Sequence, residues 1–268
     1  MPEFDHSTPV TAVLEVPSGA ITVHAEDRAT VVADVVPLDG SDTSRQAADS
    51  SVITLDGDTL VVRAPETSGW NSRRSANLGV TVRVPLDSSI AARTASAGLR
   101  ATGRFAQAQA HTASGDVRLD DVTGDAHLNA SSGRLTVSRV GGALRIASAS
   151  GDMEVGDVSG DVTAESASGR IEIRSAGGSV RAGTASGSIE IGLVRQGETG
   201  IRSSSGDVRV GVAAGTGTWL DVSTVSGSTR NDLTMGAPEG EASLRVHIRT
   251  VSGEIHLRRA TATFPAAA

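Results

Sequence analysis

The sequence predicts an all-β fold, a repeat β-solenoid (β-helix-like) with coils of about 18 residues, capped by an N-terminal β-rich segment. Three observations support this prediction. The dipeptide Ser-Gly recurs at a spacing of about 18 residues, an apolar–polar–apolar alternation follows almost every copy, and a second glycine falls midway between copies. Repetition of this length is typical of chains that stack one structural unit on the next.

The Ser-Gly copies set the period of the predicted coils. The early copies keep one spacing, and the last three drift away from it. They lie at 114–115, 132–133, 150–151, 168–169, 186–187, 205–206, 226–227 and 252–253, with a weaker Ala-Gly copy at 97–98. Glycine suits tight corners because it adopts positive φ angles without steric cost. Each repeat is therefore expected to consist of a strand, a glycine turn, a strand and a Ser-Gly turn.

Aliphatic side chains are expected to fill the interior of the coils. The alternation places Val155 and Ile173 inward and the polar residues beside them outward. The chain of 268 residues has no Tyr, three Phe and two Trp, so little aromatic volume is available. One coil alone buries too few side chains for the free energy of burial to offset the conformational entropy lost on folding. A stable coil therefore needs a neighbouring coil stacked on each of its edges. An antiparallel meander remains the structural alternative.

Charges alternate from one repeat to the next at two positions of the repeat. The first position, directly after Ser-Gly, has Asp116, Arg134, Asp152 and Arg170, and the second has Asp121, Arg139 and Asp157. Equivalent residues of a parallel stack lie about 4.8 Å apart, so unlike charges attract there and like charges repel. In-register stacking favours such alternation, and duplication of a two-repeat unit would leave the same pattern.

The register divides the chain into three parts. Residues 1–96 are the predicted N-terminal cap segment, residues 97–259 the solenoid repeats, and residues 260–268 a frayed tail. The cap is expected to cover strand edges that an open end exposes. Its expected strands are 10–16, 20–25, 29–36, 51–55, 59–64 and 79–84, with one short helix at 41–49, a surface loop at 65–77, and a later insertion loop at 236–241. The stretch SGAITV at 18–23 keeps the pattern of the repeats.

Composition excludes several classes of protein. The formal net charge is −7, with acids and bases mixed along the chain, which argues against nucleic acid and anionic membrane surfaces as partners. The absence of cysteine excludes disulfides and thiol catalysis. The N-terminus lacks the features of a signal peptide, and no apolar run is long enough for a membrane span, so we expect a cytoplasmic protein. No catalytic, cofactor-binding or metal-binding motif is present, and no cofactor is expected.

One outward column is a candidate interaction surface. Glu154, Glu172 and Glu190 occupy the same position in three successive repeats, with no alternation to relieve their repulsion. We expect Arg174 to reach across and neutralise part of this charge. The column suits hard cations or a basic partner segment, or it is simply a solvated acidic face.

A second candidate lies on the predicted surface loop. Trp70, Arg73 and Arg74 suit a contact with another protein, or the tryptophan packs back on the sheet. The six histidines show no spacing typical of metal ligands, and His127 and His256 are expected to be solvated.

The stretch VTVRVPLDSSIAARTASAG at 80–98, followed by ASGDVRL and SGDMEV, resembles the bacterial putative-adhesin β-strand-repeat family, a domain family of unknown function. The runs TWLDVSTVSGSTRNDL at 218–233 and LRVHIRTVSGEIHLRRA at 244–260 resemble its actinobacterial members. The resemblance covers residues 10–259. It implies a β-helix-like fold, and it carries no catalytic residues to transfer to this chain.

The sequence favours a non-enzymatic β-solenoid scaffold or protein-interaction module, with a protein partner or self-association. The alternative is a polysaccharide-processing or carbohydrate-binding β-helix protein. That class needs clustered carboxylates and usually aromatic platforms for sugars. Aromatic residues make up 2% of the chain, and only Phe105 and Trp219 lie within the repeats. The scarcity of aromatic residues therefore favours the scaffold, although fold alone does not fix function.

Overall fold

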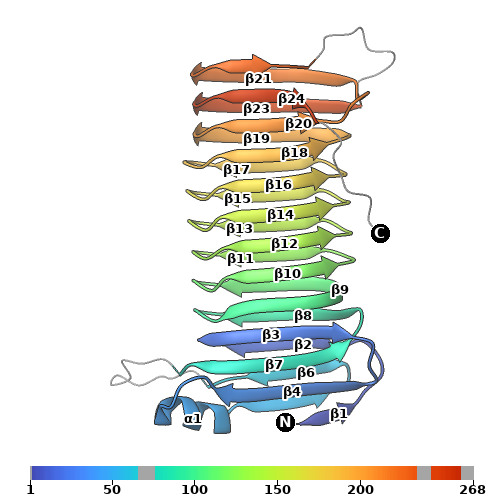
Figure 1. Ribbon diagram of the computed structural model, residues 1–268, viewed down its shortest axis with the longest axis vertical. Helices are drawn as coiled ribbons and strands as arrows, with labels where there is room; N and C mark the ends of the chain where they lie inside the picture. Colours follow the sequence, from blue (N-terminus) through green and yellow to red (C-terminus); the bar gives the residue numbers. More distant parts are fainter. Residues whose placement is uncertain (1, 66–75, 234–242, 261–268) are drawn as a thin grey trace. The chain divides into compact units, whose positions relative to one another are not determined.

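The computed structural model describes residues 2–65, 76–233 and 243–260. The chain forms two compact units, unit 1 at Met1–Gly142 and unit 2 at Ala143–Ala268, and each has its own internal packing. In both units the chain winds in successive coils, and strands form the sides of each coil (Figure 1).

The strands are short, and one helix interrupts them in unit 1. Unit 1 contains β1 (Glu3–Asp5), β2 (Thr11–Val16), β3 (Gly19–Glu26), β4 (Thr30–Pro37), α1 (Asp42–Asp49), β5 (Val52–Asp56), β6 (Thr59–Arg63), β7 (Leu78–Pro85), β8 (Ser88–Thr94), β9 (Gly98–Thr112), β10 (Val117–Val122), β11 (Ala126–Ala130) and β12 (Leu135–Val140). Unit 2 contains β13 (Leu144–Ser148), β14 (Met153–Val158), β15 (Val162–Ser166), β16 (Ile171–Ala176), β17 (Val180–Thr184), β18 (Ile189–Val194), β19 (Gly197–Ser205), β20 (Val208–Val212), β21 (Thr218–Ser226), β22 (Thr229–Asn231), β23 (Leu244–Ser252) and β24 (Ile255–Arg259).

The strand pairing confirms the predicted β-solenoid. In unit 2, β14, β16 and β18 form a parallel ladder in which Met153 lies opposite Ile171, and Ile171 lies opposite Ile189. A second parallel ladder joins β13, β15 and β17. Neighbours in each ladder are equivalent positions of successive repeats, so each coil contributes one strand to each ladder. The antiparallel meander, which would place sequential strands side by side, is therefore wrong for these coils.

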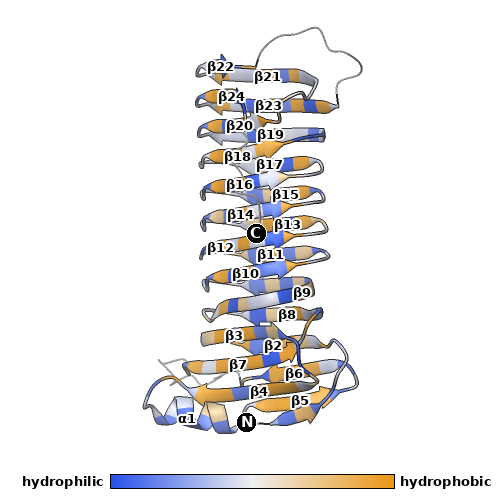
Figure 2. Ribbon diagram, turned by 45° about the vertical axis from the view of Figure 1, so that its right-hand side comes forward, coloured by the Kyte–Doolittle hydropathy of each residue, from blue (hydrophilic) through white to orange (hydrophobic). Residues whose placement is uncertain are grey.

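Inward side chains of successive coils form a mainly aliphatic core, as predicted, with a few buried serine and threonine side chains. In unit 2, Ile171, Ile173 and Ile189 are fully buried, and Val155 is 4% exposed. Figure 2 shows hydrophobic and hydrophilic residues following one another along the strands, which is the alternation expected when one face is buried. In unit 1 the core also takes in one aromatic ring, that of Phe105, which is fully buried.

The recurring Ser-Gly corner has a specific structural cause. The Oγ of Ser166, three residues before Gly169, accepts the backbone N–H of that glycine at 2.7 Å. A Cβ placed on Gly169 would lie 2.1 Å from the carbonyl oxygen of Gly151 in the preceding coil. Gly169 does not have a positive φ angle, so the expectation of backbone freedom is wrong at this corner. Glycine is required there because the corners of stacked coils lie in contact.

The order of the coils in unit 2 departs from the order of the sequence. β20 pairs with β24, and β24 pairs with β22. On the other ladder, β19 pairs with β23, and β23 pairs with β21. The coil of β23 and β24 therefore lies between two coils that precede it in the chain. The repeats were expected to stack in the order of the sequence, and this expectation is wrong after β20.

An equivalent exchange occurs in unit 1. β2 pairs in parallel with both β6 and β8, and β3 pairs in parallel with both β7 and β9. The coil of β2 and β3 thus lies between a coil made of β6 and β7 and a coil made of β8 and β9. The stretch SGAITV belongs to this coil, so parallel stacking already occurs upstream of residue 97. The three-part division of the chain stays a prediction.

Residues 1–96 also contain antiparallel strands and the helix. β4 is antiparallel to β7, β1 is antiparallel to β4, and β5 is antiparallel to β6. The predicted helix is confirmed as α1, whose first turn is capped by the side chain of Ser41. The buried hydroxyl of Ser44 accepts the N–H of Asn77 at 3.0 Å and so ties the helix to the chain before β7. β1 and β8 were not predicted from the sequence. Residues 66–75, 234–242 and 261–268 of the predicted loops and tail lie outside the described residues.

Replacing Gly169 with alanine tests the close contact of the corners. We expect Gly169→Ala to lower the free energy of unfolding by about 1–3 kcal/mol, because the neighbouring backbone must move. Gly183→Ala is the matched control, since a Cβ there meets nothing within 4 Å. Urea unfolding of both variants measures the difference, and equal stability of the two would contradict the contact.

Replacing Val155 with aspartate tests the inward assignment. The charge would enter an aliphatic stack that offers no partner, so we expect Val155→Asp to abolish soluble folding. Glu172→Gln, at an outward position of the adjacent strand, should leave folding almost unchanged. Circular dichroism and thermal melting check both variants, and a folded Val155→Asp with an unchanged Tm would show that the side chain points outward.

Candidate interaction site

Parallel stacking arranges the outward side chains of each unit in columns. Equivalent positions lie about 4.8 Å apart, so each charged side chain has the same position of the next coil as its neighbour. A column of alternating charge can pair internally, whereas a column of like charge cannot. A column of like charge is therefore stabilised by opposite charge from outside the column.

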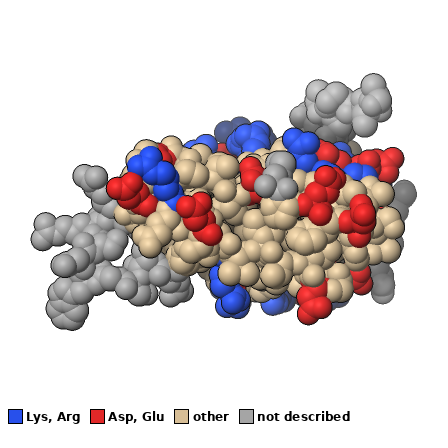
Figure 3. All heavy atoms as spheres, turned by 90° about the horizontal axis from the view of Figure 1, so that it is seen from below, with Lys and Arg blue, Asp and Glu red and all other residues tan. Residues whose placement is uncertain are grey.

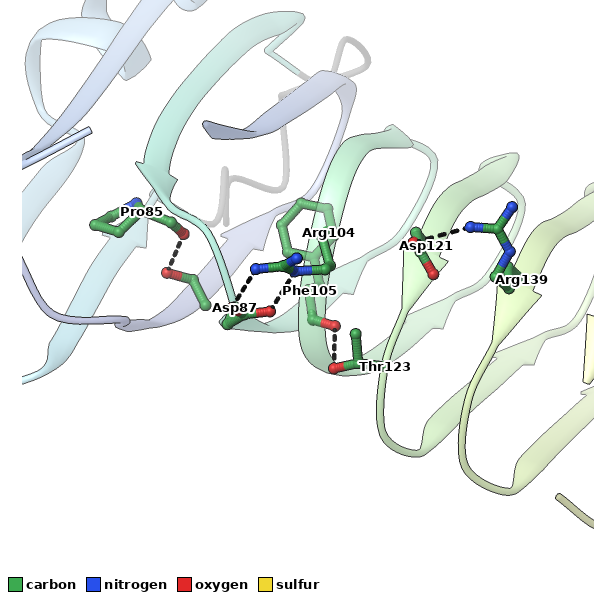
Figure 4. A network of polar contacts seen from close by, with 8 residues as sticks. Pro85, Asp87, Arg104, Phe105, Asp121, Thr123 and Arg139 are labelled. Carbon is green, nitrogen blue, oxygen red and sulfur yellow. Dashed lines mark hydrogen bonds and ion pairs between the residues drawn. The ribbon is translucent and has the colours of Figure 1, made fainter. Parts of the chain in front are cut away.

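One column of unit 1 alternates and is paired. Arg104 lies opposite Asp121, and Asp121 lies opposite Arg139. Arg139 Nη1 donates to Asp121 Oδ2 at 3.2 Å, which confirms the predicted pairing of these two residues. Arg104 turns to Asp87 and donates to both of its carboxylate oxygens at 2.7 Å (Figure 4). This column is satisfied by its own members and needs no ligand.

At the other alternating position, the aspartates bond to the main chain of the next coil. Asp116 Oδ1 accepts the backbone N–H of Arg134 at 2.8 Å, and Asp152 Oδ1 accepts that of Arg170 at 3.0 Å. Each aspartate therefore receives a main-chain hydrogen bond from the coil that follows it. The expectation of a contact between side chains missed this role, because charge sign alone does not indicate a main-chain partner.

The predicted glutamate column is present in unit 2. Glu154 lies opposite Glu172, and Glu172 lies opposite Glu190. Arg209 follows Glu190 in the same column. Glu190 accepts from Arg258 at 3.4 Å, whereas Glu172 is exposed and has no ion pair or hydrogen bond within residues 2–65, 76–233 and 243–260. The column thus contains like charges in register at its centre.

Arg174 does not neutralise this column, contrary to expectation. Its Nη1 donates to Asp157 Oδ2 at 3.3 Å. Cation binding also has no support from the geometry, because no group of three or more acidic or histidine side chains that could hold a metal ion occurs in the part of the chain that the structure describes. Trp70, Arg73 and Arg74 lie outside that part, so their predicted role stays a prediction.

Sequence reasoning missed a second column of like charge, in unit 1. Arg100 of β9 lies opposite Arg118 of β10. The sequence pattern could have shown this column, because each arginine stands between two apolar residues of the repeat and is therefore expected to point outward.

Two histidines that were expected to be solvated have partners. His127 lies edge-on to His111, with ring centroids 5.6 Å apart. His256 Nε2 lies 2.8 Å from Asp232 Oδ2. The hydrogen bonds of His256 and Arg230 hold the pKa of Asp232 below its ordinary value. Both contacts follow from stacking, which brings residues of different coils together.

An aromatic and polar cluster lies on β21 and β23 of unit 2. Trp219 is 49% exposed, and its ring centroid lies 5.0 Å from that of His247. His247 Nδ1 lies 3.4 Å from Asp221 Oδ2, and an Arg249 guanidinium nitrogen lies 3.9 Å from the same oxygen. An exposed indole beside polar groups is able to contact a sugar or a polar peptide.

Charge is mixed on the end of unit 1 seen from below. Figure 3 shows acidic and basic side chains interspersed around that face, with uncharged atoms between them. None of the helices described is both long and apolar enough to cross a membrane.

Comparisons with known proteins agree with this architecture. Residues 13–258 match the family described as Toastrack DUF4097. A putative lipid binding protein from Parabacteroides distasonis shares the fold, with a TM-score of 0.53 and 15% identity over 96% of this chain and 95% of that chain. A putative adhesin from Bacteroides fragilis aligns with a TM-score of 0.45 and 11% identity over 96% and 95% of the two chains. Comparison with curated proteins finds no match.

The histidine pair predicts a pH dependence of stability. Burial lowers the pKa of His111, and the nearby His127 and Arg93 lower it further. As the pH falls, His111 therefore becomes protonated near pH 6.5 in the unfolded chain and only at a lower pH in the folded protein. Its contribution to stability is complete above that pH and is lost as the pH falls from about 6.5 towards the lower pKa of the folded state.

We expect His111→Gln to flatten the fall in unfolding free energy between about pH 7 and pH 5. The control is His24→Gln, in which the replaced imidazole bonds to Thr102 and lies apart from the pair. Urea unfolding across this pH range measures both variants. A slope in His111→Gln as steep as that of the parent protein would contradict the assignment.

Proposed function

The chain belongs to the Toastrack DUF4097 family, and from this premise we propose that it is a non-enzymatic β-solenoid module that binds a basic segment of a partner protein or of a second copy. The glutamate column of unit 2 is the proposed contact. We also assign the chain to the actinobacterial members of the family, on the sequence runs at 218–233 and 244–260.

The observation that carries this proposal is the in-register stacking of Glu154, Glu172 and Glu190. Three carboxylates at the strand spacing repel one another, and a cationic partner relieves that repulsion. β16 and β18, which carry Glu172 and Glu190, have a paired strand on each side, and the inward residues of all three strands are buried. The carboxylates are therefore held on a rigid support, which reduces the entropy lost on binding.

A basic segment fits this column better than a single cation does. The carboxylates follow one another along the stack and do not surround one point, as the lack of a metal-ligand group among the described residues indicates. Arginine side chains spaced along a flexible segment are able to follow such a line, with charge-assisted hydrogen bonds to successive carboxylates. Exposed pairs of this kind are individually weak, so several are needed for specific binding.

The second candidate function is carbohydrate binding, and one observation favours it. Trp219 is half-exposed beside His247 and Asp221, and a flat aromatic ring with polar neighbours is a common contact for sugars. This cluster contains one aromatic ring, whereas sugar-binding surfaces usually have several. The protein-interaction role therefore remains the primary proposal.

Neutralising the column tests the proposed contact. We expect the triple variant Glu154→Gln, Glu172→Gln and Glu190→Gln to bind an oligoarginine peptide about tenfold or more weakly than the parent protein at low salt, because the negative charge of the column is removed. Fluorescence anisotropy of the labelled peptide measures the affinity, and light scattering in parallel reports any self-association.

The matched control removes the same charge from exposed positions outside the column, with Glu165→Gln, Glu198→Gln and Glu254→Gln. If both triple variants weaken binding equally, the peptide senses only net charge, and the column is not the contact. If the parent protein does not bind the peptide, the proposed partner chemistry is wrong.

A further inference from the structure

Two arginines of unit 1 are stacked in register on the outward face of one ladder. Arg100 of β9 lies opposite Arg118 of β10, with Thr22 of β3 before them and Thr136 of β12 after them. Both arginines lie between inward residues that are buried, so the alternation of the strands directs them outward. The backbone therefore holds two guanidinium groups on neighbouring strands.

These two charges are unsatisfied. Neither Arg100 nor Arg118 has an ion pair or a side-chain hydrogen bond within the described ranges of the chain. Other arginines of unit 1 are paired, such as Arg104 with Asp87 and Arg63 with Glu15. Like charges directly opposite in a ladder destabilise it, so this pair would be better accommodated with an anion between or above the two groups.

The arginines also line an open pocket of about 380 Å³. Arg134 and the threonines Thr22 and Thr136 contribute to the same wall. Asp116 lies at the pocket as well, and its Oδ1 accepts the backbone N–H of Arg134 at 2.8 Å. The unpaired guanidinium groups of Arg100 and Arg118 against one carboxylate leave a net positive lining, with hydroxyl groups available as further donors.

We propose that this pocket, the arginine pocket of unit 1, binds a dianionic tetrahedral oxyanion, namely phosphate or a phosphomonoester. Two unpaired guanidinium groups carry two positive charges, and a phosphomonoester carries about −1.5 to −2 at neutral pH. Planar guanidinium groups donate pairs of parallel hydrogen bonds to phosphate oxygens. A carboxylate brings a single charge and leaves part of the arginine repulsion in place.

This site is separate from the glutamate column in residues and in charge. The glutamate column takes cationic partners through unit 2, whereas the arginine pocket takes an anion through unit 1. The failure of one proposal therefore leaves the other intact.

Titration calorimetry with the full chain tests the proposal. The probes are inorganic phosphate, glycerol 3-phosphate and acetate, each at the same ionic strength in chloride buffer. We expect the first two to bind and acetate to bind about tenfold more weakly or not at all. Stronger binding of glycerol 3-phosphate than of phosphate would assign the site to an ester, and equal binding would assign it to the free ion; both results support the proposal.

The variant that removes the site is Arg100→Gln with Arg118→Gln, and the matched control is Arg181→Gln. Arg181 is an exposed, mid-strand arginine of unit 2 that likewise has no partner in the described structure. We expect the double variant to lose phosphate binding and the control to keep it. In phosphate-free, low-salt buffer the double variant should also have a higher Tm than the parent protein, because the repulsion is gone. If the double variant does not fold, Arg118→Gln alone should show a partial loss.

Three results would overturn the proposal. The first is absence of phosphate binding by the parent protein. The second is acetate binding as strong as phosphate binding, which would make the site a general anion contact. The third is a double variant that still binds phosphate in calorimetry but has a lower molecular mass than the parent protein in light scattering. The arginines would then belong to a contact between two copies of the chain.

Discussion

In-register parallel stacking is the constraint on which the rest of the structure depends. It places every side chain beside the equivalent side chain of the neighbouring coil, about 4.8 Å away. Inward, this gives continuous aliphatic columns such as Ile171 and Ile189. At the corners it leaves no room for a Cβ at Gly169. Outward, it forces charges into columns that either alternate and pair, as Asp121 does with Arg139, or repel. One geometric rule therefore accounts for the core, the turns and the candidate binding surfaces.

Much of the fold could be predicted because a repeating pattern records which positions are equivalent. The spacing of Ser-Gly and the alternation around Val155 were sufficient for the solenoid, and a polar stretch after Ser41 was sufficient for the helix. The exchange of coils in both units could not be predicted. A strand of alternating residues shows which face is buried, but not which strand lies at either of its edges. β20 pairs with β24, whose Ile255 and Leu257 are buried, and not with the shorter β22, whose three residues are all exposed.

The candidate sites could be predicted only in part, for a related reason. The column of Glu154, Glu172 and Glu190 follows directly from the repeat. Arg100 and Arg118 share a column as well, but the register upstream of residue 98 is weaker, and the pocket beside them depends on β3, a strand far away in the sequence. Contacts to the main chain, such as that of Asp152 with Arg170, are likewise not visible in a pattern of side-chain charges.

Because the chain contains no cysteine, a paired-cysteine experiment measures the stacking register directly. Thr163 of β15 and Arg181 of β17 are outward residues that lie opposite each other. Parallel neighbours are within the Cα separation of about 4.4–6.8 Å that a disulfide requires. Under mild oxidation, Thr163→Cys with Arg181→Cys should form an intramolecular disulfide, while Thr163→Cys with Gly183→Cys, which places the second thiol two residues out of register on the same strand β17, should keep free thiols. Free thiols in the first variant, or efficient closure in the second, would contradict in-register stacking.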